Sequence, residues 1–148
     1  MDSTVMRLQH ALFAIALITL SAVTSAQPRY AEPGTTRTSD ARAVSVSVTP
    51  LKPSDGSQPL QFRVVMETHA VDLDYDLASI ALLRDSRGNE HRPVRWDGPP
   101  GRHHVSGVLS FGQAGAILKP GAGEIELRIA GVAGAPQRVF RWETELLE

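Results

Sequence analysis

From residue 43 onward, the chain is divided into seven short apolar runs separated by turn residues. In residues 44–49 and 60–67, apolar and polar side chains alternate, which is typical of strands with one buried face. This spacing of short runs predicts an all-β fold, namely a seven-stranded antiparallel β-sandwich of immunoglobulin-like type. The remaining runs lie at 78–84, 91–96, 105–111, 125–129 and 139–142.

The composition agrees with a strand-rich domain and excludes several classes of function. The 148 residues include 12 Gly and 10 Pro, and aromatic residues make up 5%. This length suits one domain and is too short for a multidomain enzyme. The formal net charge is −1, so the chain lacks the basic surface that would attract nucleic acid or an anionic membrane. We therefore expect no nucleic-acid partner.

The first 26 residues have the pattern of a secretory signal peptide. Residues 11–20 are almost wholly apolar, and the small residues Thr24, Ser25 and Ala26 follow them. A membrane anchor is the alternative, but crossing the hydrocarbon requires about 20 apolar residues, roughly twice this run. We expect cleavage after Ala26, export to the periplasm, and no membrane span in the mature chain.

The expected mature chain consists of a leader and one domain. Residues 27–42 are polar and rich in Pro, Gly and Thr, which predicts a flexible leader. The β-sandwich domain is expected over residues 43–148. The chain has no cysteine, so disulfides cannot stabilise the fold, and thiolate catalysis and Cys-ligated metals are excluded.

Three of the predicted loops are expected to share one end of the sandwich. If each strand turns back antiparallel to the one before it, the connections alternate between two ends. Loops 69–77, 97–104 and 131–136 then fall together, whereas His91 lies near the turn at the opposite end.

Four residues of these loops are candidate ligands for a divalent metal ion. His69, His103 and His104 would supply imidazole nitrogens, and Asp72 or its neighbour Asp74 a carboxylate oxygen. Mixed nitrogen and oxygen ligation suits copper or zinc. The alternative is structural: the aspartates cap turns, and the histidines hydrogen-bond to backbone and hold the loops together. Both interpretations stay open, because the two loops meet only if the strand order is as expected.

Catalytic arrangements are less well supported than a binding site. Ser106, His104 and Asp72 could supply a nucleophile, a base and an acid, but the chain has no Gly-x-Ser-x-Gly motif. A domain of this size also offers little cleft to enclose a glycoside. We expect no enzyme activity, no catalytic residues, and no cofactor apart from the candidate metal ion.

Several motifs extend over most of the predicted domain: Thr68-His69-x-x-Asp72-Leu73, Trp96-x-Gly98, Gly101-x-His103-His104-x-x-Gly107-Val108-Leu109-x-Phe111 and Arg138-x-Phe140-x-Trp142. In this combination the chain resembles a family of small exported bacterial proteins of uncharacterised function. In compartment, size and fold class it is also similar to periplasmic copper-resistance sandwich proteins. Those proteins begin the mature chain with a histidine ligand, whereas the mature chain expected here begins with Gln27.

The sequence therefore predicts an exported, non-catalytic binding domain that uses one loop end, with copper or zinc as the candidate ligand. The alternative is an envelope protein-interaction or structural module without metal, in which the loops or a sheet edge contact a protein partner. The two differ in geometry. A metal site needs His69 close to His103 or His104, whereas docking needs a contiguous apolar patch.

Overall fold

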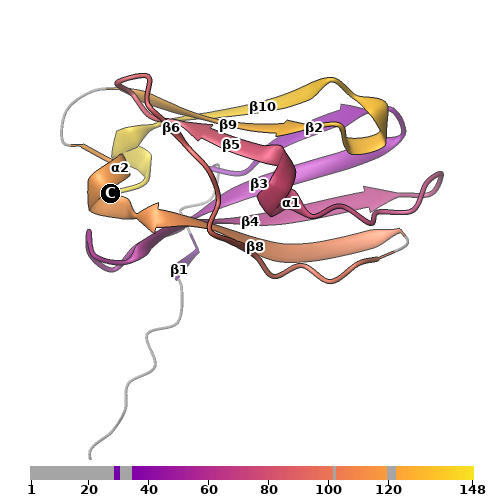
Figure 1. The fold of residues 1–148 in the computed structure, drawn as a ribbon, viewed down its shortest axis with the longest axis horizontal. Helices are drawn as coiled ribbons and strands as arrows, with labels where there is room; N and C mark the ends of the chain where they lie inside the picture. Colours follow the sequence, from indigo (N-terminus) through magenta and orange to yellow (C-terminus); the bar gives the residue numbers. More distant parts are fainter. Residues whose placement is uncertain (1–28, 31–34, 102, 120–122) are drawn as a thin grey trace, which may run out of the picture.

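The computed structural model describes residues 29–30, 35–101, 103–119 and 123–148, and antiparallel strands form two sheets in this part of the chain (Figure 1). The larger sheet contains six strands: β1 (Arg29–Tyr30), β2 (Arg37–Ala41), β3 (Val44–Lys52), β4 (Pro59–Thr68), β7 (Arg95–Trp96) and β8 (His104–Gln113). The smaller sheet contains four: β5 (Ala81–Arg84), β6 (Glu90–His91), β9 (Glu124–Ala130) and β10 (Gln137–Glu143). Short helical turns complete the fold: α1 (Leu77–Ile80), α2 (Ala114–Ile117), η1 (Val132–Gly134) and η2 (Thr144–Leu146). The expected all-β class is confirmed.

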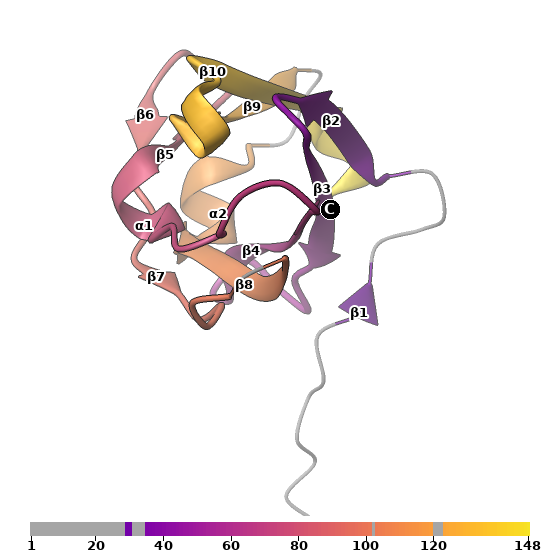
Figure 2. The ribbon, with the colours of Figure 1, turned by 90° about the vertical axis from the view of Figure 1, so that its right-hand side faces the viewer.

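The strand order places the N-terminal strands at one side of the larger sheet. Its order is β1-β3-β4-β8-β7, with β2 also paired to β3, and the smaller sheet runs β10-β9-β5-β6. The two sheets face each other, and β2 lies beside β10 on one side of the molecule (Figure 2). β2 is therefore the strand of the larger sheet that contacts the smaller sheet on that side.

The core lies between the two sheets and follows the alternation of the sequence. β3 buries every second residue from Val44 to Val48, and β9 and β10 bury alternate residues in the same way. Phe62 of β4 packs against Trp142 of β10, with ring centroids 5.3 Å apart. Because these two rings belong to different sheets, their contact stabilises the sheets against each other.

The expected strand over residues 91–96 is divided between the two sheets. β6 pairs with β5, whereas β7 pairs with β8. Pro93 lies between β6 and β7 and has no N–H to donate, so a continuous ladder cannot pass through it. The prediction of seven strands is wrong, because this run forms two strands and because residues 29–30 and 37–41 also form strands.

β2 lies within residues 27–42, where the sequence pattern predicts a flexible leader. Residues 37–41 pair with residues 44–48 of β3 in a regular antiparallel register. The segment has no apolar run, so its sequence alone does not reveal a strand. The folded part of the chain therefore begins before residue 43.

The strand expected over residues 78–84 is shorter than predicted. The Asp76 side chain accepts a hydrogen bond from Ala78 N at 3.0 Å and caps α1. An aspartate at this position favours the start of a helix, so α1 occupies residues 77–80 and the strand begins at Ala81.

The predicted signal peptide, residues 1–26, lies outside the described residues. In the described part of the chain, no helix has the length and apolar character needed to cross a membrane.

Candidate functional site

The loop after β4 and the loop before β8 are joined by backbone hydrogen bonds. Leu73 N donates to Gly101 O at 2.9 Å, and Gly101 N donates back to Leu73 O at 3.2 Å. Thr68 N donates to His103 O at 2.9 Å. The two loops that carry the candidate ligands are therefore held against each other by the backbone.

The loop between β9 and β10 lies at the same end. Ala133 N in this loop donates to the Tyr75 hydroxyl at 2.9 Å. We call residues 69–76, 97–103 and 131–136 together the loop end; Arg102 lies outside the described residues. The expectation that these three loops share one end is confirmed.

The four predicted ligands lie on or beside the loop end, but they are not assembled into a metal centre. His69, Asp72, His103 and His104 are all exposed. Among the described residues, no group of three or more His, Asp or Glu side chains is arranged to hold a metal ion. A metal site at His69, Asp72, His103 and His104 therefore stays a prediction, and it would require these exposed side chains to turn toward the ion.

His104 instead contacts a carboxylate that the sequence analysis does not single out. Glu67 of β4 and His104 of β8 are direct cross-strand partners, and His104 Nδ1 lies 3.1 Å from Glu67 Oε1. Their side chains are 61% and 62% exposed, so water screens this pair and it adds little stability. An exposed imidazole beside a carboxylate can share a proton, or both groups can contact one cation.

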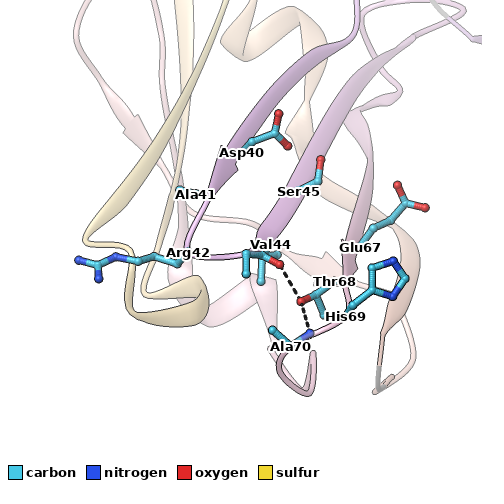
Figure 3. Close-up of a pocket in the computed structure, with 10 residues that line it drawn as sticks. Asp40, Ala41, Arg42, Val44, Ser45, Glu67, Thr68, His69 and Ala70 are labelled. Atoms are coloured by element: carbon cyan, nitrogen blue, oxygen red, sulfur yellow. Dashed lines mark hydrogen bonds between the residues drawn. The ribbon is translucent and has the colours of Figure 1, made fainter.

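An open hollow lies next to this pair, between the β2–β3 turn and the end of β4 (Figure 3). Residues 40–45 line one side, and residues 67–70, including Glu67 and His69, line the other. The Thr68 hydroxyl donates to Ala43 O at 2.7 Å and accepts from Ala70 N at 3.1 Å, which ties the two sides together. These hydrogen bonds therefore hold the two sides of the hollow in place, and the polar side chains of Glu67 and His69 are exposed along it.

The β2–β3 turn beside the hollow is held by a buried arginine from the opposite sheet. Arg138 of β10 is 2% exposed. Its Nη1 donates to Ser39 O at 2.6 Å and to Val44 O at 3.1 Å, and its Nη2 donates to Ala41 O at 2.8 Å. Burial lowers the pKa of Arg138 from its usual value, but a guanidinium stays charged in proteins. These charged hydrogen bonds fix the turn to β10.

The most strongly bound carboxylate among the described residues lies away from the loop end, in the β5–β6 turn. The Asp85 side chain is wholly buried and accepts hydrogen bonds from the backbone N–H groups of Arg87 and Asn89, and from both of their side chains. His91 Nε2 lies 3.1 Å from Asp85 Oδ2. Burial alone raises the pKa of Asp85, but these hydrogen bonds outweigh it and hold the pKa well below its usual range.

The role of Asp85 and His91 is therefore structural. The placement of His91 at the end opposite the candidate site is confirmed, since it belongs to the β5–β6 pair. The turn residues 85–89 are apparent in the sequence, but the burial of Asp85 is not.

Comparison of the chain with known protein families, with curated proteins and with solved structures gives no match. Its function therefore has to be argued from the site itself.

Proposed function

We propose that this chain is an exported, non-catalytic binding domain of the periplasm, with an immunoglobulin-like sandwich fold, and that its loop end is the binding surface. The observation that carries the proposal is the reciprocal pair of backbone hydrogen bonds between Leu73 and Gly101. Loops held together in this way keep exposed side chains in fixed relative positions without burying them. The export in this proposal rests on the signal-peptide pattern of residues 1–26.

The ligand proposed for the loop end is a divalent copper or zinc ion. Glu67 and His104 already offer one carboxylate oxygen and one imidazole nitrogen on neighbouring strands. His69 follows Glu67 at the rim of the same hollow, and His103 and Asp72 lie on the adjoining loops. These side chains are exposed, so they can turn toward an ion without opening the core. Mixed nitrogen and oxygen ligands suit both metals.

Isothermal titration of the purified protein with Cu(II) and with Zn(II) tests this proposal. We expect one ion per chain with a Kd on the order of micromolar. The triple variant His69→Ala, His103→Ala, His104→Ala should abolish binding, and Glu67→Gln should weaken it roughly tenfold by removing a charged ligand. His91→Gln is the matched control, because it removes a histidine at the opposite end. Binding that survives the triple variant, or that His91→Gln reduces equally, contradicts the metal site.

A second candidate function is an envelope protein-interaction module that uses the same loops without metal. The observation that favours it is that, among the described residues, no three His, Asp or Glu side chains are already arranged to hold a metal ion. Val71 is exposed on the loop after β4 and could contact a protein partner. In this case Val71→Asp should reduce the amount of one envelope protein that co-purifies with the chain, with chelator present throughout, and the triple histidine variant should leave it unchanged.

A further inference from the structure

The hairpin that joins β2 to β3 has an unfavourable turn. Its two central residues, Arg42 and Ala43, both have positive φ angles, 54° and 60°. Two-residue turns of this kind are usually formed by Asn or Gly, because a Cβ atom clashes with the backbone in the left-handed region. Two successive residues without that adaptation store strain, which the surrounding structure must hold in place.

The contacts that hold β2 are polar rather than hydrophobic. None of its five residues is buried, so no apolar side chain anchors the strand. On one edge it pairs with the backbone of β3. On its other side, Arg37 Nε donates to Arg141 O at 3.2 Å, and Arg138 donates to Ser39 O and Ala41 O. On the β2 side these contacts use its backbone and the Arg37 side chain, so a β2 strand supplied by a second copy would make them equally well.

The register of the hairpin is compatible with such an exchange. Ala41 pairs with Val44 next to the turn, and Arg37 pairs with Val48 at the far end. If the turn opened into extended backbone, β2 and β3 would become one long strand. Two such strands from two copies could pair antiparallel in the same register, with Arg42 of each copy opposite Ala43 of the other.

We propose that β2 exchanges between two copies of this chain, so that the β2 of each copy pairs with the β3 of the other. The exchange keeps every hydrogen bond between β2 and β3, and Arg138 still contacts Ser39 O and Ala41 O, now of the second copy. It removes the positive φ angles at Arg42 and Ala43. Short strained hinges are known to favour this type of dimer. The inference does not depend on what the loop end binds.

Cysteine pairing detects the exchange directly, because the chain has no cysteine of its own. Thr38 of β2 and Ser47 of β3 are cross-strand partners whose hydroxyl oxygens lie 2.9 Å apart. Two single variants, Thr38→Cys and Ser47→Cys, are mixed, unfolded in guanidinium, refolded together at high concentration and oxidised. Exchange predicts a disulfide between one copy of each variant, seen as a covalent dimer after denaturation.

Two controls test whether the two positions can form a disulfide and whether a covalent dimer is specific to β2–β3 pairing. The double variant Thr38→Cys, Ser47→Cys, refolded at low concentration, should form the disulfide within one chain, which shows that the two positions can be joined. A mixture of Thr38→Cys with Ser106→Cys should give no more covalent dimer than Thr38→Cys alone, since Ser106 pairs with Val65 rather than with β2. If the double variant bonds readily and the Thr38→Cys, Ser47→Cys mixture gives no covalent dimer, the proposal is wrong.

The strain at the turn predicts how the dimer fraction responds to substitution. With Arg42→Asn and Ala43→Gly together, the turn becomes favourable, and the dimer fraction after refolding should fall roughly tenfold or more. Ala133→Gly is the matched control, because Ala133 also has a positive φ of 54° but lies in η1, outside the hinge. Light scattering on a sizing column measures both. An equal dimer fraction in the original chain and the turn variant overturns the role assigned to the turn.

Discussion

Arg138 is the buried side chain on which the position of the β2–β3 hairpin depends. It belongs to the smaller sheet but donates hydrogen bonds to three carbonyl oxygens of the hairpin, those of Ser39, Ala41 and Val44. A buried guanidinium loses its hydration on folding, and only partners with good geometry compensate for that loss. Here the partners are backbone atoms, so no other side chain has to be charged for the contact to form.

Replacement of Arg138 should therefore destabilise the protein strongly. Arg138→Ala leaves the three carbonyl oxygens without these donors and opens space in the core, at a cost of about 3 kcal/mol. Arg141→Ala on the same strand is the control. Arg141 is itself 57% exposed, and it pairs with the exposed Glu124 and with the largely buried Glu126, which Arg128 also contacts. Because Arg128 remains to pair with Glu126, we expect Arg141→Ala to cost clearly less than Arg138→Ala, about 1 kcal/mol. Urea unfolding measures both variants, and equal losses would contradict the role of Arg138.

The β5–β6 turn depends on the ionised carboxylate of Asp85, as the β2–β3 hairpin depends on the guanidinium of Arg138. The pKa of Asp85 in the folded protein lies below its ordinary value of 3.8, because the hydrogen bonds from Asn89, His91 and Arg87 outweigh the effect of burial. A lowered folded pKa means that the stabilisation is complete above the unfolded pKa and is lost as the pH falls below it.

The Tm of the protein should therefore drop steeply on acidification below about pH 4. Asp85→Asn should lower the Tm at neutral pH, with a loss of about 2 to 3 kcal/mol in the free energy of unfolding. In the acid range, the Tm of this variant should depend less on pH than the Tm of the original chain. Asp74→Asn is the control, because Asp74 is exposed at the loop end. Calorimetry across pH 2 to 7 measures the three proteins. Parallel pH curves for the original chain and Asp85→Asn would contradict the prediction.

The strands that could be predicted from the sequence are those with an apolar face. β3 and β4 bury the residues that their alternation indicates. β2 could not be predicted, since its sequence, RTSDA, has no buried residue and the strand exists through its pairing with β3. The division of residues 91–96 depends on Pro93, whose effect on the ladder is predictable only when both neighbouring sheets are known.

The candidate site, too, could be predicted only in part from the sequence. The meeting of the three loops follows from counting antiparallel connections, and the structure confirms it. Glu67 could not be singled out, because its contact with His104 follows from the register of β4 against β8. The alternation of each strand indicates which residues face the core, but no short turn joins β4 to β8 to set which residues lie opposite each other.

The two sheets have no disulfide to join them, because the chain has no cysteine, and their packing depends on the core. Phe62 is fully buried and contacts Trp142 across the sheets, as well as Phe111 within its own sheet. This position links both sheets, so its removal affects the whole fold rather than one strand.

Phe62→Ala should cost about 3 to 5 kcal/mol, because the cavity cannot close between two regular sheets. Val65→Ala provides a control on the same strand, since Val65 is half-buried and points to the outer face of β4. We expect it to cost about 1 kcal/mol or less. Urea unfolding of both variants checks the difference. A loss for Val65→Ala as large as that for Phe62→Ala would show that the core does not lie where these residues place it.

The indole of Trp142 is buried between the sheets, and its Nε1 donates to Thr35 O, just before β2. Indole emission shifts to longer wavelength when the ring becomes hydrated. Separation of the N-terminal segment from β10 would remove this hydrogen bond and admit water to the ring. The chain has only two tryptophans, and Trp96 lies in the larger sheet next to β8. The chain therefore contains its own optical reporter for the attachment of its first strands, readable by fluorescence without any added dye.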